Sequence, residues 1–251
     1  MVIKEYGKQN KETIMLLHGG GLSWWNYKIE IELLQKRFHV VIPILDGHAE
    51  SDAEFISIEE NAMRIISFID EHYSGHILMI GGLSLGAQIL LEILSQKNDI
   101  CDYAIIESAL ALPMKITYKM IKPSFSLCYG LISKKWFSKL QFNSLKIRKE
   151  LFNEYYQDTC NIKKDSLIAF MEANAKYQIK NSLRNTSAKV LILVGGKERE
   201  IMKTSARKIQ EVIAGSNLEI LHGYYHGQLS INYANQYVEK IESLVSTSHI
   251  I

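Results

Sequence analysis

The stretch "GGLSLGAQ", residues 81–88, decides the fold because it joins two elements of different type. Before it stands "HILMI" (76–80), a continuous apolar run typical of a strand covered on both faces. After it, "AQILLEILSQ" (87–96) repeats its apolar residues at helical spacing. The glycines on either side of Ser84 predict a sharp turn whose neighbours leave no room for side chains. A strand, a tight turn and a helix in succession indicate an α/β sheet.

The rest of the chain repeats this alternation of strands and helices. Further apolar runs predict strands at 13–17, 39–44, 103–106 and 189–194, a weaker one at 218–221 and an edge strand in the first six residues. Helical patterns lie between them at 25–37, 58–73, 87–96, 204–214 and 233–245. This order predicts an α/β fold with a mostly parallel central sheet and helices on both faces.

One long segment interrupts the pattern. Residues 110–185 contain helical and loop patterns but no convincing strand, and they are too many for a loop in a compact domain. We therefore expect a helical cap inserted at 110–185. The α/β core would then consist of residues 1–109 and 186–251.

Composition narrows the class of protein. With 251 residues and 47% hydrophobic content, the chain can bury one sizeable core, and its net charge of +2 gives no reason to expect nucleic acid as a partner. The N-terminus lacks the apolar core of a signal peptide, and no apolar run is long enough to span a bilayer. The three cysteines lie far apart and outside metal-ligand spacing. We expect a cytoplasmic protein with reduced thiols, no metal and no cofactor.

The turn around Ser84 has the spacing of a nucleophile elbow. Gly82-Leu83-Ser84-Leu85-Gly86 reads G-x-S-x-G and stands between a predicted strand and a predicted helix, the context in which that motif has chemical meaning. The turn would expose the serine hydroxyl at the carboxyl end of the sheet and leave the Leu85 N–H at a helix N-terminus. The motif is short, so a glycine-rich connection without chemistry is the alternative.

A second glycine-rich loop follows the strand at 13–17. "LLHGGG" (16–21) matches the HGGG-type loop that supplies an oxyanion-hole N–H to a serine in a nucleophile elbow. Gly20 is the expected donor, with Gly21 as the alternative because consecutive glycines leave the register open. His18 is interpreted as a residue that braces the loop.

A nucleophilic serine needs a base and an acid that orients it. His226, in "YYHGQLSI", follows the last predicted strand and precedes the last helix. Glu198, in "LILVGGKE", stands just after another strand, and Glu200 and Glu107 are weaker alternatives. The chain order serine, acid, histidine fits the nucleophile-elbow fold.

Taken together, five segments resemble the α/β-hydrolase superfamily of esterases and lipases: "LLHGGGLSWWNY", "FHVVIPILDGHAES", "GGLSLGAQ", "LILVGGKE" and "YYHGQLSI". The resemblance implies that Ser84 is the nucleophile, His226 the base and Glu198 the acid, with the oxyanion hole formed by Gly20 and Leu85. It also implies a buried tryptophan near Trp25. The sequence departs from the family in having Glu where Asp is the commoner acid.

The expected function is hydrolysis of small or medium carboxylic esters, or of thioesters, through an acyl-enzyme. A lyase or C–C bond hydrolase with the same triad remains open, and so does a non-catalytic ligand-binding member. The partner would be a small-molecule acyl ester, and the sequence leaves the oligomeric state open. We expect the substrate pocket to include Gly21, Trp24 and Trp136.

The predicted cap has an unusual charge pattern. Residues 108–149 contain no Asp or Glu but nine Lys and Arg, with aromatic residues between them. Such a cap suits an anionic substrate or transient contact with a membrane surface. A solvated lysine face over an apolar underside is the simpler interpretation, and the sequence favours it.

Overall fold

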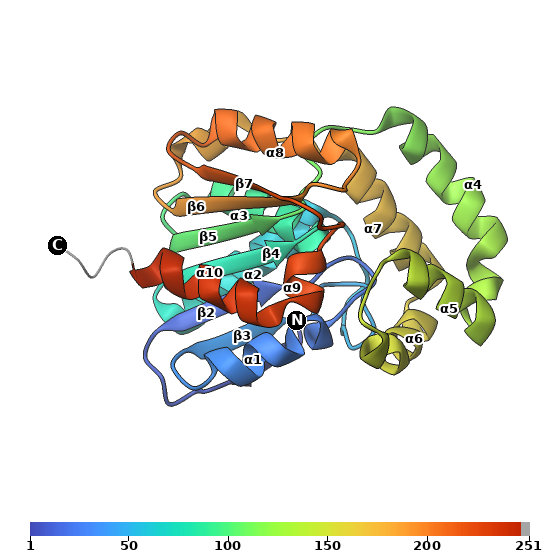
Figure 1. Cartoon of the computed structure of the whole chain (residues 1–251), viewed down its shortest axis with the longest axis horizontal. Coiled ribbons are helices and arrows are strands. Elements are labelled where there is room, and N and C mark those ends of the chain that lie inside the picture. The colour runs from blue at the N-terminus through green and yellow to red at the C-terminus, as the bar shows by residue number, and fades with distance from the viewer. Residues whose placement is uncertain (247–251) are drawn as a thin grey trace.

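The computed structural model describes residues 1–246, and its centre is a seven-stranded sheet of order β1-β3-β2-β4-β5-β6-β7 (Figure 1). Edge strand β1 pairs antiparallel with β3, and the remaining neighbours pair in parallel. This arrangement confirms the predicted fold class. The strands are β1 (Ile3–Tyr6), β2 (Thr13–Leu17), β3 (His39–Pro43), β4 (Ile77–Leu83), β5 (Cys101–Glu107), β6 (Lys189–Gly195) and β7 (Asn217–Leu221).

Helices cover both faces of the sheet, and a separate apolar core lies under each set. One face carries α2 (Ile58–Tyr73), α3 (Leu85–Gln96) and α8 (Glu200–Val212). The other carries the 3₁₀ helix η1 (Trp24–Tyr27), α1 (Lys28–Leu34), α9 (Gln228–Asn232) and α10 (Ala234–Ser246). Because both faces are covered, β2 is buried along its whole length and β4 at every residue but Leu78, which explains their continuous apolar runs.

Helix α2 shows how local sequence sets an element. The Ser57 hydroxyl accepts a hydrogen bond from the Glu60 N–H at 3.0 Å and so caps the helix start. Ala62, Ile65 and Ile69, one helical stripe, are fully buried against the sheet. The helix begins and ends at the residues that the pattern predicts.

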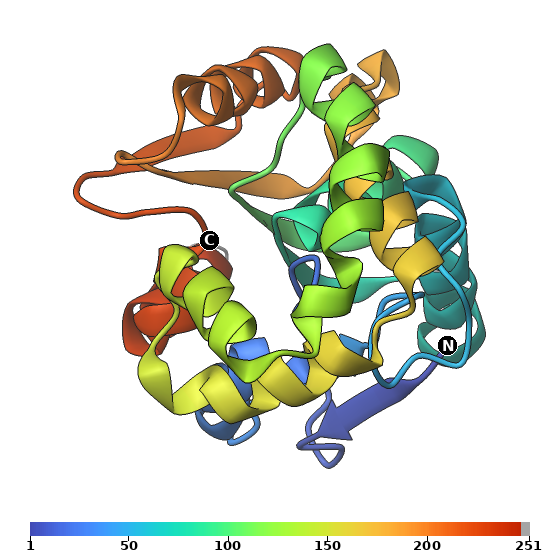
Figure 2. The same ribbon diagram turned by 90° about the vertical axis from the view of Figure 1, so that its right-hand side faces the viewer.

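Residues 110–185 contain only helices and loops. They form α4 (Lys115–Ile132), α5 (Lys135–Ser144), η2 (Lys149–Leu151), α6 (Phe152–Asn161), α7 (Lys164–Lys176) and η3 (Asn181–Asn185). Helices α4 to α7 lie to one side of the sheet, with α4 outermost and packed on α7 (Figures 1 and 2). The division into a core of 1–109 and 186–251 and a cap of 110–185 stays a prediction that this arrangement supports.

Candidate active site

Ser84 is the single residue between β4 and α3. Its backbone has φ 53° and ψ −109°, a region that residues with a side chain adopt rarely. The flanking glycines are required by space, since a Cβ on Gly82 would lie 2.6 Å from the Gly86 carbonyl oxygen, and one on Gly86 would lie 2.3 Å from that of Leu17. The G-x-S-x-G spacing therefore reflects a crowded turn that projects the Ser84 side chain.

The structure brings Ser84, His226 and Glu198 into one hydrogen-bonded chain, although 142 residues separate the serine from the histidine. His226 Nε2 lies 3.0 Å from Ser84 Oγ. On the other side of the ring, His226 Nδ1 lies 2.6 Å from Glu198 Oε2. This is the arrangement in which an imidazole can take the proton of a serine while a carboxylate orients it.

The surroundings of the pair favour an ionised acid beside a basic histidine. Burial acts against the charge of Glu198, but hydrogen bonds from His226, Gly195 and Ser108 together with the charge of His226 hold the pKa of Glu198 below its usual value. Burial likewise acts against a charged His226, yet the bond to Glu198 and the charges of Glu198 and Glu107 raise the pKa of His226 above 6.5. An ionised carboxylate only accepts, so Nδ1 donates to Glu198 and Nε2 is left to accept the Ser84 proton.

Ser108 is a site residue that the sequence did not reveal. It follows β5, has a left-handed backbone with φ 55°, and donates its hydroxyl hydrogen to Glu198 Oε1 at 2.7 Å. The same Oε1 accepts the Gly195 N–H at 2.7 Å, and Ser108 Oγ accepts the Gly227 N–H at 3.2 Å. A lone serine after a strand carries no local signal; only the assembled sheet places it beside the acid.

The alternative acids lie elsewhere. Glu200 stands at the exposed start of α8 and pairs with Lys203 and Arg207. Glu107 is buried at the end of β5, where its Oε1 accepts the Ser230 N–H at 3.3 Å, and burial raises its pKa to about 7. Neither carboxylate has a hydrogen bond to His226 within residues 1–246, so the geometry favours Glu198.

Gly20 and Leu85 lie together beside Ser84, and a Cβ on Gly20 would be 3.5 Å from the Leu85 Cβ. No hydrogen bond of either backbone N–H is found within the part of the chain that the structure describes. The Gly21 N–H, in contrast, donates to His48 Nε2 at 3.0 Å. This bond removes Gly21 as the alternative donor and leaves Gly20 and Leu85 as the candidate oxyanion hole.

Two buried histidines hold the glycine loop in place. His18 donates from Nδ1 to the Gly19 carbonyl and accepts the Leu45 N–H at 3.1 Å, the bracing role expected for it. His48 accepts from Gly21 and donates from Nδ1 to the Asp46 carbonyl at 3.1 Å. Burial lowers the pKa of His18 to about 3 and that of His48 to about 4, so both rings are neutral at pH 7. The sequence did not indicate the role of His48.

A cavity of about 270 Å³ opens at Ser84. Its wall includes Gly19, Gly20, Leu85, Ser108, His226 and Gly227 from the core. The rest is mainly apolar and comes largely from residues 110–185, among them Leu110, Met114, Leu145, Ile147, Phe170 and Met171. A second chamber of about 130 Å³ shares Gly20, Leu145, Phe170 and Met171 with the first and lies among α4 to α7. The site is thus an apolar, two-chambered cavity with Ser84 and His226 in its wall and Glu198 behind His226.

Two of the expected pocket residues lie outside this lining. Trp24 is half-buried and donates from Nε1 to Glu50 at 3.0 Å, with Lys4 over its ring. Trp136 is 64% exposed on α5. Gly21 contributes to the second chamber only. Aromatic residues in a cap sequence do not show which face of their helix they occupy, and here Phe170 is the aromatic wall of the cavity. Trp25, by contrast, is buried as expected.

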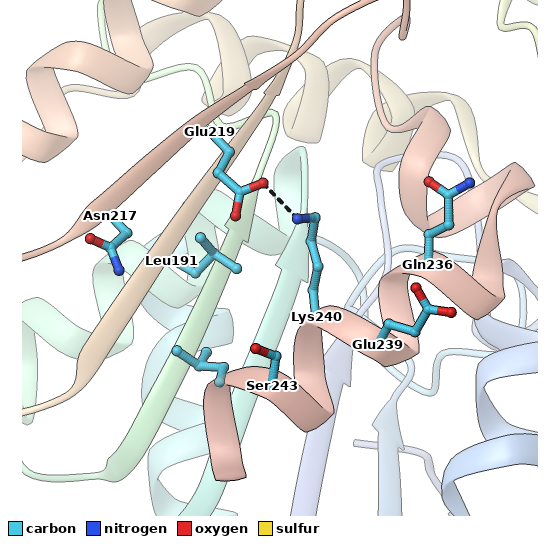
Figure 3. A pocket seen from close by; sticks show the side chains of 8 residues that line it. Leu191, Asn217, Glu219, Gln236, Glu239, Lys240 and Ser243 are labelled. Carbon is cyan, nitrogen blue, oxygen red and sulfur yellow. Dashed lines mark hydrogen bonds and ion pairs between the residues drawn. The ribbon is translucent and has the colours of Figure 1, made fainter. Parts of the chain in front are cut away.

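A larger hollow of about 490 Å³ lies between β6, β7 and α10 (Figure 3). The ion pair of Lys240 with Glu219, at 2.5 Å, crosses it, and its other labelled residues are mostly polar. None of its described lining residues is a histidine, so we place the candidate active site at Ser84. Within residues 1–246, no group of three or more His, Cys, Asp or Glu is arranged to hold a metal ion.

Comparison with known proteins identifies the family. The chain is similar over 98% of its length to a carboxylesterase of Nitrososphaera gargensis (17% identity, 94% of that chain, TM-score 0.80). It is also similar to a thermophilic esterase of Thermogutta terrifontis (16% identity, 98% of this chain and 93% of that chain, TM-score 0.77) and to the enol-lactonase of Burkholderia xenovorans LB400 (13% identity, 98% and 96%, TM-score 0.81). These identities show a shared fold. A sequence profile of the hydrolase family described as serine aminopeptidase, S33, matches residues 8–230. The chain therefore belongs to the serine aminopeptidase S33 family of hydrolases, within the α/β-hydrolase superfamily.

Proposed function

We propose that this protein hydrolyses small or medium carboxylic esters through an acyl-enzyme on Ser84. The single observation that carries the proposal is the hydrogen-bonded chain Ser84–His226–Glu198, whose serine and histidine line an apolar cavity. A serine within 3.0 Å of an imidazole, itself oriented by a carboxylate, is the arrangement that activates a hydroxyl toward an acyl carbon.

The volume and the lining of the cavity favour a small, uncharged substrate. Its volume of about 270 Å³ lies near the lower end of ligand pockets, which range from roughly 300 to 1,000 Å³. Of the described residues that line either chamber, none is Asp, Glu, Lys or Arg. A charged acyl group would lose its hydration there without gaining a partner. An aliphatic or aromatic acyl group would instead be buried against Leu, Ile, Met and Phe side chains.

Acylation begins with attack of Ser84 Oγ on the ester carbonyl carbon while its proton passes to His226 Nε2. Glu198 stabilises the imidazolium and keeps its own charge. The carbonyl oxygen becomes negative and accepts hydrogen bonds from the N–H groups of Gly20 and Leu85, each worth about 3 kcal/mol of barrier in comparable sites. His226 then gives its proton to the leaving alcohol, which departs and leaves the acyl group on Ser84.

Deacylation repeats the same chemistry with water as the nucleophile. His226 takes a proton from water, the hydroxide attacks the acyl carbon, and the same two N–H groups hold the oxyanion. Return of the proton to Ser84 Oγ releases the carboxylic acid. A thioester would follow the same steps with a thiol as the leaving group.

Peptide hydrolysis from an N-terminus is less well supported, although the family description includes it. An aminopeptidase must pair the substrate ammonium with a carboxylate or similar acceptor, and neither chamber has a lining Asp or Glu in the described chain. A lyase or C–C bond hydrolase would use the same triad and is distinguished by its products. The names of the carboxylesterase, esterase and enol-lactonase structures agree with ester chemistry. At these sequence identities, however, the similarity is evidence for a shared fold only.

The test is hydrolysis of p-nitrophenyl esters from acetate to dodecanoate, with the acid product identified by mass spectrometry. We expect turnover of short and medium esters, a decline for long chains, and no release of p-nitroaniline from leucine p-nitroanilide. Ester turnover that survives in Ser84→Ala, or preference for the anilide, would contradict the proposal.

A further inference from the structure

Helix α4 has two apolar faces, and only one of them is packed. Its inner face, with Tyr118, Ile121 and Phe125, lies against α7. Its outer face carries a second stripe, at spacings of four and seven residues, whose side chains point to solvent. These are Ile116 (82% exposed), Met120 (57%), Leu127 (85%) and Leu131 (37%). Burying one face against α7 accounts for the first stripe and leaves the second without a partner in this fold.

Helix α5 extends the outer stripe with Trp136 and Leu140, which are 64% and 63% exposed. Both helices lie on the side of the molecule that faces the viewer in Figure 2. Within residues 1–246, six of the twelve exposed large hydrophobic side chains belong to α4 and α5. We call these six residues the α4–α5 surface: Ile116, Met120, Leu127, Leu131, Trp136 and Leu140. A concentration of this kind marks an interaction site.

The charges on α4, α5 and the turn between them have a single sign. Its two helices and the turn between them carry exposed lysines and no carboxylate: Lys115, Lys119, Lys122, Lys134, Lys135 and Lys139. None of the six is in an ion pair within the described part of the chain. The nearest acidic residues along the sequence, Glu107 and Glu150, lie outside α4 and α5. The lysine charges therefore have no compensating partner within these helices.

We propose that the α4–α5 surface binds the surface of an anionic phospholipid membrane. A helix with solvent-facing Leu, Ile, Met and Trp between lysines lies in the plane of a bilayer interface, with its apolar side chains in the acyl boundary and its cations at the lipid phosphates. An acidic protein surface would pair with the lysines but would not bury the six apolar side chains. Within residues 1–246, each helix is too short or too polar to span a bilayer.

This surface is the outer side of the wall that encloses the cavity. Phe125 and Ile132 of α4 and Gln141 of α5 line the second chamber, while the α4–α5 surface faces away from it. Binding would hold the cap against the lipid. If the proposed function is correct, esters dissolved in that membrane are a substrate class within reach; membrane binding itself does not depend on catalysis.

The test is co-flotation with vesicles of phosphatidylcholine alone and with 30% phosphatidylglycerol, at low and high salt. We expect flotation with anionic vesicles that weakens as salt rises. The double variant Ile116→Asp with Leu127→Asp should lose it, while Ile56→Asp, at a 67% exposed position away from α4 and α5, should retain it. Neutralising Lys119, Lys122 and Lys135 to Gln should lower partitioning about a hundredfold, since each lysine near an anionic surface contributes roughly fivefold. The charge-matched control replaces Lys8, Lys36 and Lys208 by Gln.

Circular dichroism and thermal unfolding show whether each variant folds, and vesicle partitioning needs no enzymatic activity. Wild-type protein that stays with the buffer at low salt would overturn the proposal. So would equal loss in the Ile56→Asp control, or a wild-type dimer that Leu127→Asp converts to a monomer, because the surface would then be covered by a second copy.

Discussion

Ser108 ties the acid of the triad to the loop that carries the base. Its Oγ donates to Glu198 Oε1 at 2.7 Å and accepts, at 3.2 Å, the N–H of Gly227, the residue after His226. One hydroxyl thus fixes both partners of the His226–Glu198 bond, from the end of a third strand. The residue adopts a left-handed backbone, φ 55°, to reach this position.

Replacing Ser108 by Ala removes a hydrogen bond to a charged carboxylate, an interaction worth about 1.5–3 kcal/mol. We expect kcat to fall by roughly 10- to 100-fold, more than any change in KM, because the Ser108 hydroxyl, although in the cavity wall, is bonded to Glu198 and to the Gly227 N–H. Steady-state kinetics with a short p-nitrophenyl ester measures both. Ser205→Ala is the matched control, a buried serine of α8 whose hydroxyl has no hydrogen bond within residues 1–246. Equal effects of the two changes would contradict a positioning role for Ser108.

The pH dependence of kcat/KM reports on His226. The base must be neutral to accept the Ser84 proton, and the pKa of His226 is raised above 6.5 by Glu198 and Glu107, whose influence outweighs that of burial. Activity should therefore be full above that pKa and fall as pH drops through it. In Glu198→Gln the strongest of these raising effects is lost, so the acid limb should move to lower pH while kcat falls by about 10⁴. An acid limb at the same pH in both proteins would contradict the assignment of Glu198.

Stability should depend on pH through His48. Burial lowers its pKa to about 4, against about 6.5 when unfolded. The unfolded chain then binds the extra proton between these values, so the free energy of unfolding decreases as pH falls below 6.5. Between pH 7 and pH 5 this amounts to about 2 kcal/mol. In His48→Gln the decrease over this interval should be smaller by that amount, measured by urea unfolding. His222→Gln, at an exposed position, is the control; the same decrease in wild type and His48→Gln would contradict the account.

Met171 is one of four residues that line both chambers of the cavity. Met171→Ala should join them and admit longer acyl chains. Two further buried methylenes, at about 0.8 kcal/mol each, would raise kcat/KM for octanoate relative to butyrate by roughly tenfold. Met202→Ala, at a residue that lines only the larger chamber, should leave the ratio nearer to that of the wild type. A ratio unchanged in Met171→Ala would show that acyl chains do not enter the second chamber.

Most of the fold could be predicted from the sequence because strands, helices and helix caps leave local patterns in it. The strand at 13–17 and helix α2 have the predicted limits, and Ser57 caps α2 as its spacing to Glu60 implies. Strand β4 continues past its predicted end at residue 80 to Leu83, because Gly81 and Gly82 lower the apolar signal although they continue the strand. Strand β5 spans Cys101–Glu107, longer at both ends than the predicted 103–106. Seven strands, including the edge strand β1, form the sheet.

Some residues of the candidate site could likewise be predicted from the sequence, and others could not. Ser84, His226 and Glu198 each stand in a loop whose chain position follows from strand and helix order, so their meeting could be predicted. Ser108 and His48 act through bonds to residues distant in sequence, and nothing near them indicates a partner. Trp24 and Trp136 do not line the cavity as predicted, because the sequence does not show which way a side chain faces. The orientation of the cap helices determines which aromatic residues face the cavity, and it leaves the α4–α5 surface exposed.

The most direct test of the central claim is the reaction of the folded protein with a fluorophosphonate, with the modified residue located by mass spectrometry. We predict one adduct, on Ser84, that is absent in Ser84→Ala and slowed in Ser108→Ala, while an unreactive serine such as Ser230 stays unmodified. No adduct on the folded protein, or an adduct that persists in Ser84→Ala, would contradict the assignment of Ser84 as an activated nucleophile.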